Sequence, residues 1–177
     1  MLEDDYPINI EGAAFRADGT LLLGLRFPVA ADGGPILVEL DGVERLFEPG
    51  YRLPEVRGFW VVDAVGRNGD VAGVRDLAIV SAADGEELHL VTGNVDSRDK
   101  QSVLVQDYPG GRHTVATHFR CALPPDAHSG SLQATFVREF PNLPRVEGIA
   151  ITDDGRFFYV TDEDEGVHLR LTRLLAG

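Results

Sequence analysis

Three acidic residues recur at the same place in three similar stretches of the sequence. Glu11, Asp76 and Glu147 each stand at the start of an apolar run that leads to a turn ending in Asp-Gly and then to a second apolar run. They are spaced 65 and 71 residues apart. Carboxylates that converge on one point repel one another unless they are protonated or bridged by a metal ion. Because hard oxygen ligands favour Ca²⁺ or Mg²⁺, the three residues are candidate ligands of a divalent cation.

Arginines lie close to these acidic residues and offer a second interpretation. Each carboxylate could instead cap a backbone turn or form an ion pair with Arg26, Arg75 or Arg145. Arg26 and Arg75 are also candidate anion clamps, since a guanidinium group matches the geometry of a phosphate. The sequence leaves both interpretations open.

The elements that must position these residues are strands. Short runs rich in Val, Leu, Phe and Tyr, bounded by Gly, Pro, Asn and Asp, predict strands; they occupy 19–27, 35–40, 43–48, 58–65, 86–93, 102–108, 113–119, 132–140 and 156–162. No window of eleven or more residues carries an apolar stripe with the helical period between a capping residue and a glycine stop. The sequence therefore predicts an all-β fold.

The repeat predicts how the strands are grouped. Gly19, Gly85 and Gly155 follow the three acidic residues by eight or nine positions, and Asp-Gly between apolar runs is typical of a hairpin turn. We expect a partial β-propeller, in which residues 1–177 form a single arc of two to three blades of four- to five-stranded antiparallel sheet, with repeats that start near residues 8, 72 and 144. A complete propeller needs at least four blades, so the arc is expected to belong to a larger ring, or to self-associate through its open blade edges. A β-sandwich is the alternative.

Two stretches resemble known families. "INIEGAAFRADGTLLLGLRFP" followed by "GVRDLAIV" resembles a bacterial propeller family of unknown function, and "VEGIAITDDGRFFYVTDEDEGVHLRL" is similar to a blade of the β-propeller phytases and the related esterase-like phytases. In those enzymes, glutamates of this kind hold calcium at the mouth of the central channel. The resemblance implies Glu147 and Glu163 as calcium ligands. Both are eight residues from Gly155, so a hairpin that turns near Gly155 is expected to bring them opposite each other.

Composition excludes several classes of protein. The formal net charge of −13 at pH 7 argues against binding to nucleic acid or to an anionic membrane surface. Cys121 is the single cysteine, so no disulfide framework exists. No run of eighteen apolar residues occurs, and the acidic start is unlike a signal peptide, so the expected location by default is cytoplasmic.

Two functions agree with these features. The first is a binding or scaffold role for a propeller domain or fragment that holds a structural divalent cation, with Ca²⁺ as the expected cofactor. The second is a calcium-dependent phosphoester or ester hydrolase of the phytase-like kind, acting on a small phosphorylated or ester substrate. Because propellers host both functions, the fold does not choose between an enzyme and a binding module.

Overall fold

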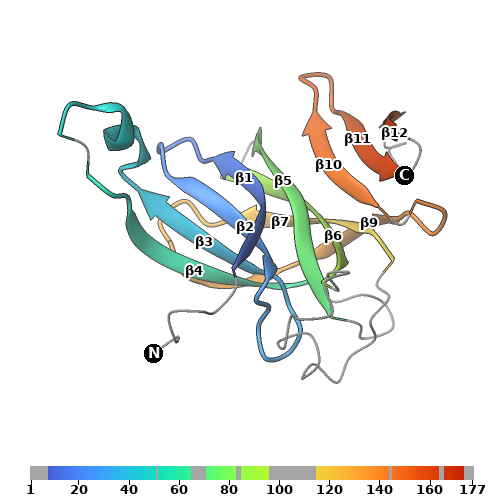
Figure 1. Ribbon diagram of the computed structural model, residues 1–177, viewed down its shortest axis with the longest axis horizontal. Helices are drawn as coiled ribbons and strands as arrows, with labels where there is room; N and C mark the ends of the chain where they lie inside the picture. The colour runs from blue at the N-terminus through green and yellow to red at the C-terminus, as the bar shows by residue number, and fades with distance from the viewer. Residues whose placement is uncertain are drawn as a thin grey trace.

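The computed structural model of the protein describes residues 8–50, 52–64, 71–82, 85–95, 115–143, 145–163 and 166–173, and Figure 1 shows their arrangement. These residues form an all-β structure of twelve strands and one short 3-10 helix, η1 (Val43–Phe47). No helix in these ranges has the length and apolar character that crossing a membrane requires.

The strands form three separate sheets, whose first strands follow one another along the chain. Sheet I has the order β1-β2-β3-β4-β8, sheet II the order β5-β6-β7-β9, and sheet III the order β10-β11-β12. The pairing is antiparallel throughout except between β4 and β8, which are parallel. The strands are β1 (Asn9–Phe15), β2 (Leu21–Phe27), β3 (Ile36–Asp41), β4 (Glu55–Asp63), β5 (Ala72–Ala82), β6 (Gly85–Asn94), β7 (Thr117–Leu123), β8 (Gly130–Gln133), β9 (Thr135–Glu139), β10 (Val146–Ile151), β11 (Arg156–Glu163) and β12 (Gly166–Arg173).

Two of the predicted strands differ in the structure. The run 43–48 forms helix η1 and not a strand, because Gly42 enters it with a left-handed φ of 72° and only Val43 of the run is buried, so there is no alternating apolar face to pair. The run 132–140 is divided between two sheets, with β8 beside β4 in sheet I and β9 beside β7 in sheet II. The predicted strand at 102–108 lies outside the described residues.

The three sheets stack face to face. We call the face of a sheet that looks toward the next sheet along the chain its forward face, and the opposite face its backward face. The forward face of sheet I, with Leu22, Leu37 and Trp60, packs against the backward face of sheet II, with Leu88 and Leu90. In the same way, Val91 on the forward face of sheet II packs against Val146, Ile149, Phe157 and Tyr159 on the backward face of sheet III. In Figure 1 the first strands of the sheets, β1, β5 and β10, accordingly follow one another across the molecule.

The first hairpin of each sheet contains a β-bulge at the same place. The pairing register shifts between Ile10 and Gly12, between Val74 and Asp76, and between Val146 and Gly148. A bulge leaves one residue without a partner across the ladder and re-aims its side chain. The residues that the three bulges single out are Glu11, Arg75 and Glu147.

Candidate functional site

The three bulged residues meet where the first strands of the sheets come together. Arg75 Nη1 on β5 lies 3.0 Å from Glu11 Oε2 on β1 and 3.5 Å from Glu147 Oε1 on β10. Arg26 on β2 completes the group, because its Nη1 lies 2.7 Å from Glu11 Oε1. The structure thus brings together four of the residues predicted from the sequence, and it joins them as arginine–carboxylate pairs.

Charge balance in this central network favours ion pairing over metal binding. Two guanidinium groups face two carboxylates, so the carboxylates are neutralised without an added cation. Burial lowers the pKa of Arg75, and the neighbouring Arg26 lowers it further, whereas Glu11 and Glu147 raise it. The Arg75 side chain is 8% exposed, so its charge needs compensation from partners such as Glu11 and Glu147.

Asp76 lies beside this network but points to a different partner. Its Oδ2 accepts a hydrogen bond of 2.8 Å from the Ile149 backbone N–H on β10, and its Oδ1 accepts one of 2.8 Å from the Leu77 N–H. Burial raises the pKa of Asp76, and the two backbone hydrogen bonds oppose that rise. Asp76 therefore joins sheet II to sheet III through the backbone, and the bulges align Arg75, not Asp76, with Glu11 and Glu147.

The hairpin of sheet III does not have the register that was expected for Glu147 and Glu163. Gly148 pairs with Val160 and Val146 with Thr161, so the bulge at Glu147 lies opposite residues 160 and 161. Glu163 lies two residues farther along and pairs with Gly166 of β12. The expectation that the two glutamates are directly opposite is wrong, because the hairpin is centred on residue 154. The side chain of Glu163 lies outside the described residues.

A second polar network is buried between sheets I and II. The Glu39 carboxylate is fully buried and accepts hydrogen bonds from Arg16, from the Thr20 hydroxyl at 3.1 Å and from the Trp60 indole N–H at 3.0 Å. His128 Nδ1 lies 2.7 Å from the same carboxylate.

Asp18, Glu39 and His128 each place a ligand atom within 4.8 Å of the others, which is a spacing that could hold a metal ion. Four donor groups already use the acceptor capacity of Glu39, whose two oxygens offer about four lone-pair sites. An ion at this place would have to displace them, and in particular it would compete with the Arg16 guanidinium at 3.2 Å. The chemistry of the cluster therefore fits a structural hydrogen-bond centre better than a metal centre.

A third network runs through the interface between sheets II and III. Glu87 Oε1 lies 2.9 Å from His89 Nε2, His89 Nδ1 lies 2.9 Å from His118 Nε2, and His118 Nδ1 lies 2.8 Å from the Tyr159 hydroxyl. Two neutral histidines satisfy every contact when Tyr159 donates to His118, His118 to His89, and His89 to Glu87.

Burial governs the proton affinities of this histidine chain. It lowers the pKa of His118 to about 3, with His89 adding to the effect, and it lowers the pKa of His89 against the pull of Glu87. Burial also raises the pKa of Tyr159 to about 12. The two histidines and Tyr159 are therefore neutral at neutral pH. Cys121 is buried nearby in the core between sheets I and II, and burial raises the pKa of its thiol to about 12, which fits a packing residue.

A signal for the second and third networks is present in the sequence. Glu39 in "ILVEL" and His89 in "ELHLVTG" alternate with apolar residues, so each shares a strand face with its neighbours two positions away. For Glu39 that face carries the fully buried Leu37, and a charged residue on such a face needs buried partners. Which partners it finds depends on the neighbouring sheet.

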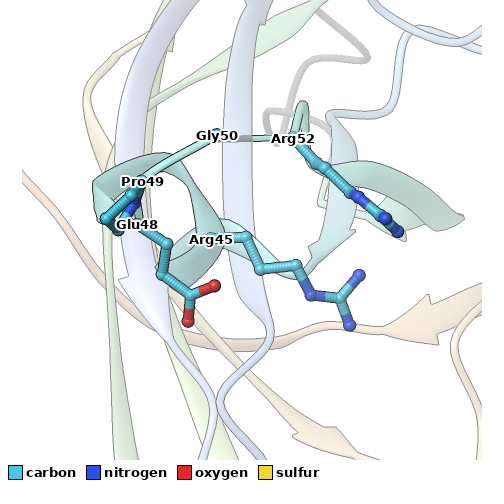
Figure 2. Close-up of a pocket in the computed structure, with 5 residues that line it drawn as sticks. All are labelled: Arg45, Glu48, Pro49, Gly50 and Arg52. Carbon is cyan, nitrogen blue, oxygen red and sulfur yellow. The ribbon is translucent and has the colours of Figure 1, made fainter.

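Two surface pockets in the described part of the chain are lined by residues other than the predicted site residues. One is lined by Arg45, Glu48, Pro49, Gly50 and Arg52, and Figure 2 shows both arginines extending to the same side, with Glu48 apart from them. Arg45 pairs with Glu44 at 3.7 Å and its side chain is 46% exposed, so solvent screens these charges. A second pocket lies between Phe15 and Phe47 and is edged by Asp18, Asp41 and Glu44.

Comparisons with models of protein families, with curated proteins and with solved structures found no match to this chain.

Proposed function

We propose that this chain is an arc of a β-propeller with a binding or scaffold role and no catalytic activity. The three stacked sheets, each starting with a bulged hairpin, support the propeller arrangement, in which β1, β5 and β10 are the innermost strands. The same faces are used at both interfaces between sheets, which is the geometry expected of blades that repeat around an axis.

One observation carries the scaffold role: Arg75 lies between Glu11 and Glu147. In a calcium-dependent hydrolase the carboxylates of the central site would hold the metal, and the arginines would grip the substrate. Here the carboxylates and the arginines satisfy one another across all three sheets. The guanidinium of Arg75 then does the structural work that a divalent cation would otherwise do, and the central network serves to hold the arc together.

The hydrolase remains the second candidate because the central network is partly open. The side chain of Glu147 is 38% exposed and its contact with Arg75, at 3.5 Å, is the longest in the network. The Glu11 side chain is 23% exposed. A small phosphorylated or ester substrate and a Ca²⁺ ion would approach from the exposed side of Glu147 and Glu11. Arg26 and Arg75 would then bind the anionic group of the substrate.

Calcium dependence separates the two candidates. Melting temperature is measured by circular dichroism with millimolar Ca²⁺ and with a chelator, and cleavage of p-nitrophenyl phosphate and p-nitrophenyl acetate is followed in the same buffers. The scaffold role predicts equal melting curves and rates equal to buffer. A calcium-dependent rate that Glu147→Gln removes would overturn it in favour of the hydrolase, and a calcium-raised melting temperature would show that the site binds the ion.

Arg75→Met tests the structural role directly. The substitution keeps much of the side-chain volume but removes the cation between Glu11 and Glu147, so Glu11 keeps its pair with Arg26 while Glu147 loses its contact with Arg75. We expect a loss of about 2–3 kcal/mol in the free energy of unfolding, somewhat below the usual cost of breaking a fully buried pair because the carboxylates are partly exposed. Added Ca²⁺ should recover part of this loss in the variant only. A loss below about 0.5 kcal/mol would mean that the network does not hold the sheets.

A further inference from the structure

The backward face of sheet I is apolar, and it is exposed around Ala13, Phe15 and Phe59. The pairing register places Ala13, Leu23, Val38 and Phe59 in one row across β1, β2, β3 and β4, and a neighbouring row begins with Phe15 and Leu21. Phe15 is 62% exposed and Phe59 is 55% exposed. An exposed apolar sheet face of this kind marks an interaction surface.

The equivalent faces of the other two sheets are buried within the same chain. The bulges align Ala13 with Leu77 of sheet II and Ile149 of sheet III. Leu77 is 3% exposed and Ile149 is 6% exposed, whereas Ala13 is exposed. In each buried case the cover is the forward face of the preceding sheet. The backward face of sheet I is therefore equivalent to two faces that are buried in this chain, and both of those are covered by the forward face of another sheet.

Sheet III carries the complementary surface. Gly12, Ala14 and Gly24 on the forward face of sheet I let sheet II approach closely, since a Cβ atom added at Gly24 would lie 2.5 Å from Val74 Cγ1. The aligned positions on the forward face of sheet III are Gly148 and Ala150 on β10, with the half-buried Val160 beside them on β11. The face has the same small residues along its first strand, and Ala150 is exposed.

We propose that two copies of this chain associate head to tail, with the forward face of sheet III of one copy covering the backward face of sheet I of the other. The contact continues the two interfaces between sheets inside each chain, and it rests on the propeller arrangement proposed above. It is heterologous, and two such contacts close a ring. That ring contains six sheets, which lies within the range of four to eight blades found in propellers.

The mass in solution and two charged variants test this association. Sedimentation or light scattering at high concentration should give roughly twice the chain mass of 19.2 kDa. Phe59→Asp damages the backward face of sheet I, and Ala150→Asp damages the forward face of sheet III. Each variant alone lacks one half of every contact and should be a monomer. An equimolar mixture retains one intact contact and should form a weaker heterodimer at the highest concentrations.

The control is Val115→Asp, which places the same charge at a position that is 39% exposed and belongs to neither face; it should remain a dimer. Circular dichroism melts establish that all three variants fold. A wild-type monomer would overturn the proposal and point to a further sheet of a longer chain as the cover. A dimer that Phe59→Asp abolishes but Ala150→Asp leaves intact would also overturn it, because the sheet I faces would then pair with each other. Neither result depends on whether the protein is an enzyme.

Discussion

At the scale of the residue, the charged groups of this protein are used to join sheets. Arg75 links carboxylates on β1 and β10, Asp76 binds the backbone of β10, and Glu39 gathers donors between sheets I and II. No buried side-chain N or O atom among the described residues lacks a hydrogen-bond partner. A buried polar group without a partner costs about 1–3 kcal/mol. Because another packing of the sheets would leave these groups without partners, the networks determine the relative position of the sheets and also stabilise it.

The histidine chain gives a prediction for acid sensitivity. The unfolded state takes up a proton on His118 below a pKa of about 6.5, whereas in the folded state burial lowers the pKa to about 3. Acid therefore favours the unfolded state. The stabilisation due to neutral His118 is fully present above the unfolded-state pKa of about 6.5, and it is lost progressively as the pH falls toward the folded-state pKa of about 3. We expect the free energy of unfolding to fall between pH 6.5 and 5 by up to about 1.4 kcal/mol per pH unit for this residue.

Urea unfolding at pH 7, 6 and 5 measures this slope. His118→Phe should lose the part of the slope due to His118, whatever its effect on stability at pH 7. Leu90→Ala serves as the comparison, since it alters a buried residue and removes no titrating group, so it should keep the wild-type slope. A wild-type slope that His118→Phe leaves unchanged would mean that His118 does not titrate in this way.

At the scale of the element, bulges and glycines set how closely strands of different sheets approach. Each bulge turns one charged side chain toward the junction of β1, β5 and β10. Gly73 shows such a close approach, because a Cβ atom there would lie 2.1 Å from the backbone oxygen of Arg26. Glycine inside a strand commonly marks such a close approach of another backbone.

Gly24→Ala tests the packing of β2 on β5. The added Cβ atom would meet Val74 Cγ1 at 2.5 Å and Leu77 Cδ2 at 2.8 Å, so both side chains or the sheets must shift. Overpacking of this kind costs about 1–3 kcal/mol, which urea unfolding can measure. The comparison is Gly155→Ala, which meets nothing within 4 Å but has a positive φ of 74°; its cost should be about 1 kcal/mol. Equal stability of wild type and Gly24→Ala would contradict the close contact.

At the scale of the whole molecule, a strongly acidic chain presents an apolar face. Two copies, each with a formal net charge of −13, repel at long range, while the face around Phe59 attracts by burying apolar area. The proposed association should therefore strengthen with salt, since the Debye length is about 10 Å at 0.1 M and shorter above it.

Sedimentation equilibrium in 50 mM and 500 mM NaCl measures this dependence. We expect the dissociation constant of the dimer to fall several-fold at the higher salt concentration. The variant Phe59→Asp, carrying one further negative charge on the contact face, should stay monomeric in both. Dissociation that increases with salt would instead indicate an association held by ion pairs, which the apolar face does not explain.

The sequence by itself determined the all-β class and the grouping of strands around three hairpins. Strand periodicity and Asp-Gly turns are local properties, so they can be recognised without knowing which strands pack together. Gly19 and Gly155 have the positive φ that such turns require. The sequence also singled out Glu11, Arg26, Arg75 and Glu147. It left open whether these residues bind a cation or one another, because that depends on distances between strands that are far apart in the chain.

The tertiary structure decided the partners. Glu11 and Arg75 are 64 residues apart, and only the stacking of sheets I and II brings them to 3.0 Å. Bulges shift the pairing register by one residue. As a result Arg75, and not the expected Asp76, lies at the junction of the first strands, and Glu163 does not lie opposite Glu147. The helix at Val43–Phe47 and the crossing of β8 to sheet I followed from packing as well. Pattern along the chain predicts elements, but ion pairs and registers are settled by which surfaces the elements bury together.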